Sequence, residues 1–423
     1  MTDFKHRQHW RCFWYTRSME MTEQQTQAHN QKVHTQSLSM TRFGDGLVDP
    51  KLVLSWVLTS VGAGPLWVGL LVPVREAGSL LPQLFTAAKL RQFSVRKWWW
   101  VIGSVVQGVM VFLMALSALF LSGNAAGAAI IGCLTVFAVA RSGCSISYKD
   151  VLGKTVDKSR RGAVSGAASS ISAVGVLAFG LLLLFQVFDQ RLIVFGALFL
   201  ATVLWMLAAL RFSALVEEPS VVSDTARDPV TRAYIGYLLK DTELQKLIVV
   251  RGLLTATAVA PPFLILLAQV GDTNLLTQLG GLVVASSFAS FVSGRIWGGL
   301  CDWSTPLVLA GSGLMSVLFL LVALWGVGAG LYETLWFLPV VLFGLMVSYQ
   351  GVRLARNVHL VNLANEETRA AYAAISNTII GVVLLATGLF GVLAEVYDVQ
   401  LVVWVLAGMS LVGGLLGFSL KRP

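Results

Sequence analysis

Long apolar runs, each about 20 residues in length, constrain the fold of this chain more than any other feature. A helix of that length crosses a bilayer, because it rises about 1.5 Å per residue against a hydrocarbon core about 30 Å thick. Only 13% of the 423 residues are charged, about half the usual share in soluble domains. The sequence therefore predicts an all-α membrane protein with twelve transmembrane helices. They are expected at residues 52–74, 76–94, 98–121, 124–147, 164–186, 190–210, 247–269, 275–294, 307–328, 333–352, 372–394 and 399–419.

The positions of lysine and arginine predict which side of the membrane each loop faces. We count Lys89 and Arg91, at the end of the second span, with the loop that follows, and Arg191, at the start of the sixth, with the loop before it. Of the 31 basic residues, only Arg75 and Arg191 are then on the side opposite the termini, and only Arg141 and Arg251 fall within spans. Basic residues collect in cytoplasmic loops, so we expect both termini to be cytoplasmic, in a bacterial inner membrane. The same distribution argues against nucleic-acid binding, because the net charge of +9 is spread over many loops.

The chain is expected to contain two similar halves. Residues 212–246 are polar and predict a cytoplasmic linker between six-helix bundles at 52–211 and 247–423. The third to sixth spans precede the ninth to twelfth by 208 or 209 residues, whereas the first precedes the seventh by 195. Residues 1–51 form a tail that we expect to be disordered. Alternatively, its aromatic and basic residues rest on the anionic inner leaflet.

The segment GRIWGGLCD at 294–302 is the strongest local motif. Gly294 and Gly298 share one helix face, where small residues let a neighbouring helix approach closely. Asp302 then emerges at the membrane interface, where it can accept hydrogen bonds from a helix N-terminus or an arginine. The motif fits a conformational latch, or a helix-packing face with a solvated aspartate.

The run from Gly298 to Asp302 resembles the signature that the major facilitator superfamily carries between the second and third spans of each half. A degraded copy at 88–97 keeps the basic pair Arg96 and Lys97, and the loop from Asp150 to Arg161 is similar to the family's loop after the fourth span. The resemblance implies a transporter of two parallel six-helix halves. The latch residues that it implies are Gly294, Arg295, Gly298, Asp302, Arg96, Lys97, Asp150 and Arg161.

Arg141 is the charged residue expected deepest in a span. A central arginine costs about 2.5–3.5 kcal/mol on insertion scales, so it normally faces the bundle interior. It could hold an anionic substrate group or modulate a coupling proton, since Arg141-Ser142-Gly143 resembles the start of a family motif linked to proton coupling. Alternatively, it snorkels to the interface and pairs with Asp150. Arg251, near a span end, is expected to snorkel.

Two proline-containing segments predict where a substrate would bind. Gly64-Pro65 is placed midway along the first span and Pro261-Pro262 midway along the seventh. Interrupted helices in corresponding positions of two halves point to a midplane site, although a kink can also serve packing alone. Tyr349 and Gln350 could add polar contacts to such a cavity.

No acidic residue is expected at mid-span in this topology, so an exporter of organic cations is disfavoured. The sequence therefore predicts a secondary transporter that moves a small neutral or anionic solute by alternating access. Proton coupling follows from the resemblance alone. We expect contacts with lipid, a monomer, no cofactor or metal, and no enzymatic activity. The alternative is a membrane sensor that binds solute without net flux.

Overall fold

The computed structural model describes residues 23–83, 86, 90, 93–157, 159–185, 189–216, 238–268, 275–364 and 369–421, and this part of the chain contains helices and no strand. Ten helical segments of it are long and apolar enough to cross a membrane. The helices are α2 (Glu23–Leu47), α3 (Val53–Ser60), α4 (Pro65–Leu80), α6 (Lys97–Phe120), α7 (Gly123–Thr155), α8 (Arg161–Leu184), α9 (Gln190–Ser213), α11 (Thr242–Leu253), α12 (Ala256–Ala268), α13 (Leu275–Trp303), α14 (Thr305–Gly328), the 3₁₀ turn η1 (Leu331–Glu333), α15 (Phe337–Leu363), α16 (Arg369–Thr387), α17 (Leu389–Val396) and α18 (Val399–Gly417).

The predicted first span is wrong. Residues 52–74 contain α3, a turn at 61–64 and the first ten residues of α4. Gly62 adopts a positive φ of 76° in this turn, which glycine tolerates without steric cost, and Pro65 occupies the first turn of α4, where its missing N–H is not needed. The turn is apolar, so hydropathy does not separate the two helices, and the second helix begins at Pro65 instead of residue 76.

The expected disordered tail is wrong for residues 23–47, which form α2 and pack against α8 and α9. This helix is polar, but its polar atoms bond within the helix assembly. The His34 ring (Nε2) lies 2.8 Å from the Thr155 hydroxyl, and the Asn30 amide donates to the Val216 carbonyl at 3.0 Å. A hydropathy criterion therefore misses it. Residues 1–22 lie outside the described part, as does most of the predicted linker at 212–246.

The helices repeat with a nearly constant offset. Helices α4, α6, α8 and α9 begin at residues 65, 97, 161 and 190, and α13, α14, α16 and α18 begin at 275, 305, 369 and 399, which are 208 to 210 residues later. The shorter offset of the predicted first span was a consequence of its misplacement.

Tertiary contacts follow the same repeat. The Arg96 guanidinium donates to the Asp150 carboxylate at 2.6 Å, which joins the start of α6 to α7. Thr305 and His359, each 209 residues later in the chain, join the start of α14 to α15 at 2.7 Å between Oγ1 and Nδ1. Equivalent helix ends are thus joined in both halves, by an ion pair in the first and by a hydroxyl–imidazole hydrogen bond in the second.

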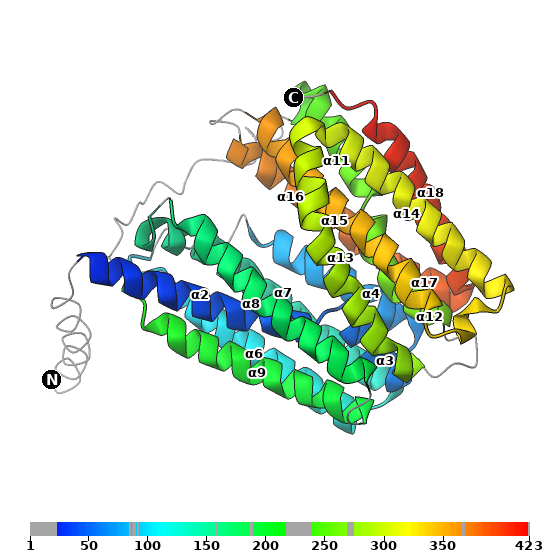
Figure 1. Ribbon diagram of the computed structural model, residues 1–423, viewed down its shortest axis with the longest axis horizontal. Coiled ribbons are helices and arrows are strands. Elements are labelled where there is room, and N and C mark those ends of the chain that lie inside the picture. The colour runs from blue at the N-terminus through cyan, green and yellow to red at the C-terminus, as the bar shows by residue number, and fades with distance from the viewer. Residues whose placement is uncertain are drawn as a thin grey trace.

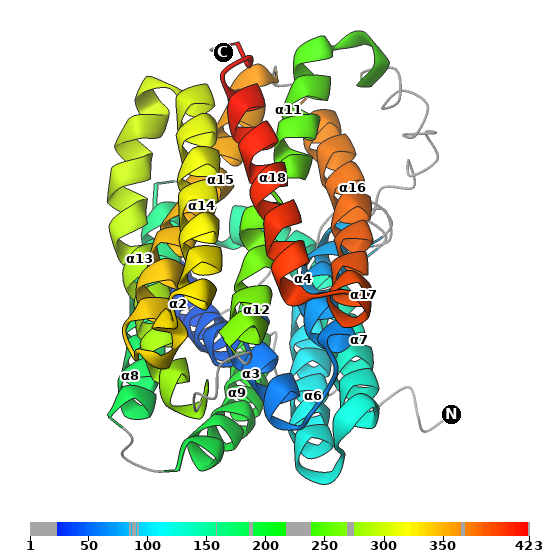
Figure 2. The same ribbon diagram turned by 90° about the vertical axis from the view of Figure 1, so that its right-hand side faces the viewer.

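The helices form two groups that meet at one end and diverge at the other (Figures 1 and 2). In one, α6 packs on α7 and α9, and α2 packs on α8 and α9. In the other, α14 packs on α15 and α18, and α13 packs on α15. The groups touch where α8 meets α13 and where α4 meets α16 and α17. Glycine permits close contact at both places: a Cβ on Gly280 would clash with the Leu184 backbone nitrogen, and one on Gly391 would lie 2.7 Å from the Leu66 carbonyl oxygen.

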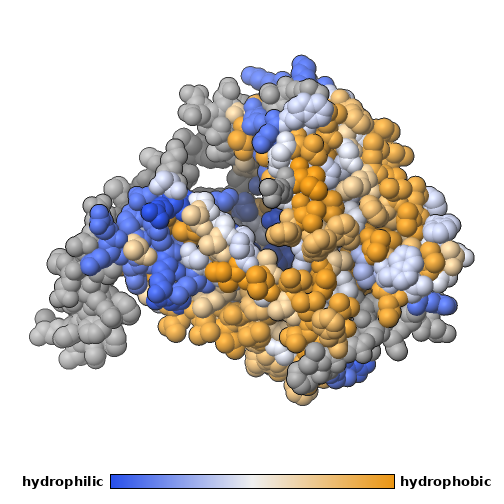
Figure 3. All heavy atoms as spheres, in the orientation of Figure 1, coloured by the Kyte–Doolittle hydropathy of each residue, from blue (hydrophilic) through white to orange (hydrophobic). Residues whose placement is uncertain are grey.

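The divergent end leaves a hollow between the two groups. Figure 3 shows hydrophobic side chains over much of the outer face and hydrophilic ones in the depth of this hollow. An apolar exterior with a polar interior cavity is the arrangement that a bilayer favours, since charged groups at membrane depth face a water-filled space.

Candidate functional site

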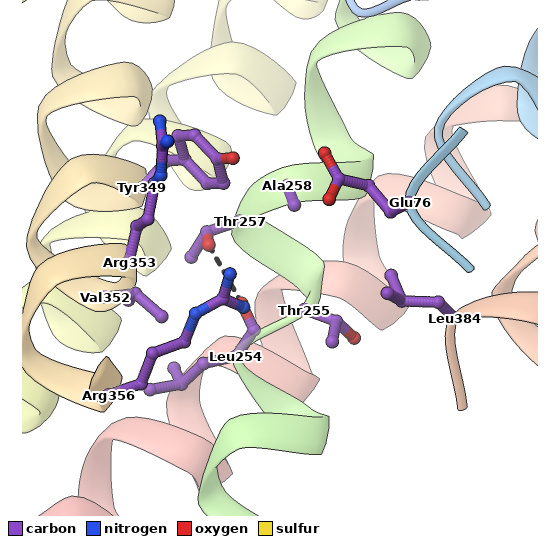
Figure 4. A pocket seen from close by; sticks show the side chains of 10 residues that line it. All are labelled: Glu76, Leu254, Thr255, Thr257, Ala258, Tyr349, Val352, Arg353, Arg356 and Leu384. Carbon is purple, nitrogen blue, oxygen red and sulfur yellow. Dashed lines mark hydrogen bonds between the residues drawn. The ribbon is translucent and has the colours of Figure 1, made fainter. Parts of the chain in front are cut away.

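A pocket lies between α4, α12, α15 and α16, where the two groups of helices meet. It is lined by charged, hydroxyl and apolar side chains (Figure 4). They are Glu76, Leu254, Thr255, Thr257, Ala258, Tyr349, Val352, Arg353, Arg356 and Leu384.

An interrupted helix forms one wall of the pocket. Helix α11 ends at Leu253 and α12 begins at Ala256, about one and a half turns before the pair Pro261 and Pro262. A proline lacks the N–H that bonds the carbonyl four residues earlier, and its ring displaces that carbonyl. Pro261 and Pro262 therefore leave the carbonyls of Thr257 and Ala258 without these N–H partners, and at the break the Thr257 N–H donates to the Leu254 carbonyl, three residues earlier, at 3.2 Å. The sequence predicts the interruption at Pro261-Pro262, but the helix is interrupted at residues 254–255, and the two prolines lie within α12.

A second helix break, between α2 and α3, places Lys51 of the first half of the chain against Tyr349, which lines the pocket. Between α2 and α3, the Asp49 carboxylate accepts from the N–H of Lys51 at 2.8 Å and of Leu52 at 3.1 Å. The Lys51 side chain is only 5% exposed, and its Nζ lies 3.3 Å from the centroid of the Tyr349 ring on α15. This stacking of a cation on an aromatic face ties the break to the opposite group of helices.

Unpaired charges of both signs face each other across the pocket. Glu76 projects from α4 toward the side of the pocket formed by Arg353 and Arg356 of α15 (Figure 4). Within the described residues, none of the three forms an ion pair at 4.0 Å or less. Lys51 and Arg75 also lie within electrostatic range of Glu76. A ligand in this pocket would meet three charged groups that form no ion pair with any described residue.

Beside the pocket, one carboxylate joins three helices. Asp45 of α2 forms an ion pair with Arg75 of α4 at 3.0 Å through one oxygen, and with Arg141 of α7 through the other. The Arg141 side chain is 28% exposed. It therefore neither snorkels nor pairs with Asp150. Arg42 lies within electrostatic range of Asp45 and Arg141.

The expectation that acidic residues avoid the helix interior is wrong. Asp45 belongs to a helix that hydropathy missed, and Glu76 lies near the end of α4 instead of in an outer hairpin. Basic residues still outnumber acidic ones, six to three, in the connected cluster around the pocket. Its members are Arg42, Lys51, Arg75, Arg141, Arg353 and Arg356 with Asp45, Asp49 and Glu76.

Arg251 is buried and does not snorkel as expected. It is 4% exposed, and its guanidinium donates to the Ser376 hydroxyl at 2.7 Å and to the Asn377 amide oxygen at 2.9 Å on α16. Arg42, 209 residues earlier, makes the equivalent contact in the first half, donating to the Ser165 carbonyl at 2.6 Å and to the Ser165 hydroxyl at 2.9 Å on α8. Each arginine thus fastens the first helix of its half to the fifth.

The replacement Ser376→Ala is expected to lower the free energy of unfolding by about 1–3 kcal/mol, because it leaves a buried guanidinium N–H without its acceptor. Ser165→Ala is the matched control and should cost less, since Arg42 keeps the backbone carbonyl of the same residue as an acceptor. Denaturant titration of the purified protein in detergent micelles measures both changes. Equal losses for the two variants would contradict this assignment.

The other predicted pocket residues lie elsewhere, except Tyr349. Gly64 and Pro65 are at the start of α4, at the end opposite the divergent one, where the Leu66 N–H donates to the Glu395 carboxylate at 3.3 Å. Gln350 donates to the Ser290 hydroxyl of α13 at 2.8 Å and is not among the residues that line the pocket.

In the described part of the predicted latch of the second half, the glycines make no helix-packing contact and Asp302 makes no ion pair. A Cβ added to Gly294 or Gly298 would meet nothing within 4 Å, so the expected packing face has no neighbouring helix. Asp302 is exposed and forms no ion pair within the described residues. The groups of helices diverge at this end, which separates α13 from its potential partner. The Arg295 side chain lies outside the described residues, as do residues 88, 89, 91 and 92 of the degraded motif copy.

The latch residues of the first half bond within that half. Besides the Arg96–Asp150 pair, the Lys97 ammonium donates to the carbonyls of Ser213 and Leu215, at 2.9 and 2.6 Å, and so caps the end of α9. Arg161 donates to the carbonyl of Gly153 at 2.6 Å and caps the end of α7. Cations at helix C-termini stabilise carbonyls that lack an intrahelical partner.

Sequence reasoning missed most of the charged cluster. The predicted topology places Arg353 and Arg356 in a loop, but α15 continues to Leu363. Arg42 and Asp45 were assigned to the tail. One signal could have found them: Arg42 lies 209 residues before Arg251, which is the offset of the repeat, so the first helix of the first half should include it.

No protein-family model matches the sequence, and no curated protein matches it. Solved structures do match its fold. A mutant of the nucleoside transporter NupG has a TM-score of 0.70 and 14% identity, covering 93% of this chain and 100% of that one. A POT family transporter in complex with a thioalcohol-conjugated peptide has a TM-score of 0.69 and 11% identity, covering 91% and 94%. The chain has the fold of these transporters, as the resemblance predicts, and its ten long apolar helices indicate an integral membrane protein.

Proposed function

We propose that the chain is a secondary transporter that moves a small neutral or anionic solute by alternating access. The observation that carries this proposal is the pocket of unpaired charges between two groups of helices, lined by an interrupted helix. Transporters place their substrate sites at such interruptions, where the free backbone groups and a water-filled cavity coincide. The fold shared with nucleoside and POT family transporters supports the same function.

In this proposal the two groups of helices are six-helix bundles, at about residues 23–213 and 242–417. They would rock against each other around the pocket. The groups diverge on the side where α2 begins and the chain ends (Figure 1). If both termini are cytoplasmic, as the loop charges predict, this conformation opens inward. We retain the bacterial inner membrane and the monomeric state as parts of the proposal.

We propose that proton coupling involves Asp45. Its carboxylate is held by Arg75 and Arg141, so protonation would release two helices from α2 at once. A neutral carboxyl loses most of its attraction for a guanidinium, which gives a proton a direct effect on the packing of α2, α4 and α7. Arg141 then modulates the coupling site and does not itself bind solute.

Flux in proteoliposomes tests the proposal. Purified protein is reconstituted, a proton gradient of either sign is imposed, and uptake of a panel of small solutes is measured. The panel begins with nucleosides, peptides and 5-aminolevulinic acid, the ligand classes that appear with the similar folds. We expect concentrative uptake of at least one neutral or anionic solute. Absence of flux for every solute under both gradients would remove the transport proposal.

The second candidate function is a solute sensor, and the same pocket supports it. A sensor would show saturable binding, measured as thermal stabilisation of the purified protein, with no flux of the bound solute. Measuring both binding and flux on the same preparation therefore distinguishes a transporter from a sensor.

A further inference from the structure

We propose that Arg353 and Arg356 form an anion-binding subsite in the pocket, and that the solute is a small organic anion whose acid group they hold. That the bound anion is a transported solute rests on the proposed function. The anion-binding site itself rests on the geometry of the pocket. It narrows the substrate from neutral or anionic to anionic.

The two arginines are placed to act together on one ligand. They are three residues apart on α15, hence on one helix face, and both line the pocket (Figure 4). Neither forms an ion pair within the described residues. The Nε atom of Arg356 is buried and has no hydrogen-bond partner. Two planar guanidinium groups with free donors match the paired oxygens of a carboxylate or phosphate.

The charges around the pocket favour an anion. Glu76 is the single acidic residue among the lining side chains, against Arg353 and Arg356. Lys51 lies within electrostatic range of Glu76, and Arg251 within range of Arg356. Asp49 also lies within electrostatic range of Lys51, so two carboxylates face these four cations, and the balance stays positive. When the protein closes around a neutral solute, the positive charge of the pocket stays uncompensated in a low-dielectric site, which costs free energy. An anionic solute offsets this charge.

Arg141 is excluded as the main anion ligand by its own bonding. Its guanidinium is already paired with Asp45, and it is not among the residues that line the pocket. Arg353 and Arg356 thus take the substrate-holding role that sequence reasoning considered for Arg141.

Hydroxyl groups supply the remaining polar contacts. Thr257 and Thr255 donate to the backbone carbonyls of Leu254 and Gly252, at 2.8 and 2.6 Å. Their oxygens keep lone pairs that can accept from hydroxyl or amine groups of a ligand. The pocket therefore suits an organic acid that also carries hydrogen-bond donors.

Binding of defined probes to the purified full chain tests the inference. The probes are succinate, glycerol 3-phosphate and inorganic phosphate, and the neutral controls are succinamide and glycerol, all at constant ionic strength. Comparing the affinity for succinate with the affinities for the two phosphate probes shows which acid group the subsite prefers. We expect at least one anion to bind, with neither neutral control binding comparably.

Variants assign the binding to the two arginines. R353Q and R356Q are each expected to raise the Kd of the bound anion by about tenfold or more, because each removes a charge-assisted hydrogen bond. R353K and R356K keep the charge and should lose less. R191Q replaces an exposed arginine at the start of α9 and should leave the Kd unchanged. E76Q removes the opposing charge and should lower the Kd by a few-fold.

Several results would overturn the inference: no binding of any of the three anions, equal binding of the neutral controls, or a Kd unchanged in both glutamine variants. The flux assay separates this failure from that of the proposed function. If the protein transports a neutral solute and R353Q and R356Q do not change that flux, the transport function is supported and the anion subsite is rejected. If anion binding depends on the two arginines but no flux is measured, the anion subsite is supported and the transport function is rejected.

Discussion

Replacing Arg141 with alanine is expected to lower solute flux about 100-fold. The guanidinium is one of two that hold the Asp45 carboxylate, and the pair links α7 to α2. Truncating one partner of a partly buried charge pair costs about 2–5 kcal/mol, and 100-fold corresponds to about 2.7 kcal/mol. The initial rate of uptake into proteoliposomes, normalised to the amount of inserted protein, measures the loss.

A conservative variant and a double variant make the result specific. Arg141→Lys retains the charge and should keep more flux than Arg141→Ala. Asp45→Asn combined with Arg141→Ala should be less impaired than the sum of the single effects, because the two residues act through one contact. Additive losses, or near-normal flux in Arg141→Ala, would contradict a coupled role for this pair.

Adding one methyl group at Gly391 is expected to lower flux by at least about tenfold. The Cβ of Gly391→Ala would lie 2.7 Å from the Leu66 carbonyl oxygen and 3.0 Å from the Leu66 Cα. The backbone of α4 cannot yield as a flexible side chain can, so α17 and α4 must separate at the end where the groups now meet. Overpacking of this kind costs about 1–3 kcal/mol, which is enough to shift the population of two rocking conformations about tenfold or more.

Gly408→Ala on α18 is the matched control, because its added Cβ would meet nothing within 4 Å. It should keep flux within about twofold of the parent, as expected for a substitution without new contacts. The population shift is read from a cysteine introduced at Ala394, which is 6% exposed on α17. A membrane-impermeant thiol reagent, used in a background lacking the native cysteines, should modify it faster in Gly391→Ala. Unchanged labelling together with unchanged flux would show that this contact does not govern the conformational change.

Hydropathy predicted most helices well for a physical reason. A bilayer requires about 20 apolar residues per crossing and satisfied backbone hydrogen bonds, so helices such as α6 and α9 are visible in the sequence alone. It failed at α2, whose hydrophilic residues bond to neighbouring helices, and at the apolar turn before Pro65. A repeat-based criterion performs better there, since Arg42 and Arg251 are separated by the common offset.

The sequence by itself determined the membrane environment, most helix positions and the resemblance to a transporter family. These properties depend on composition and on neighbours along the chain. Only the tertiary structure decided which charges meet. Asp45 contacts Arg141 across 96 residues of sequence, and Glu76 faces Arg353 and Arg356 from the other half of the chain. An ion pair or a pocket depends on which helix faces oppose each other, and that is set by the packing of the whole assembly.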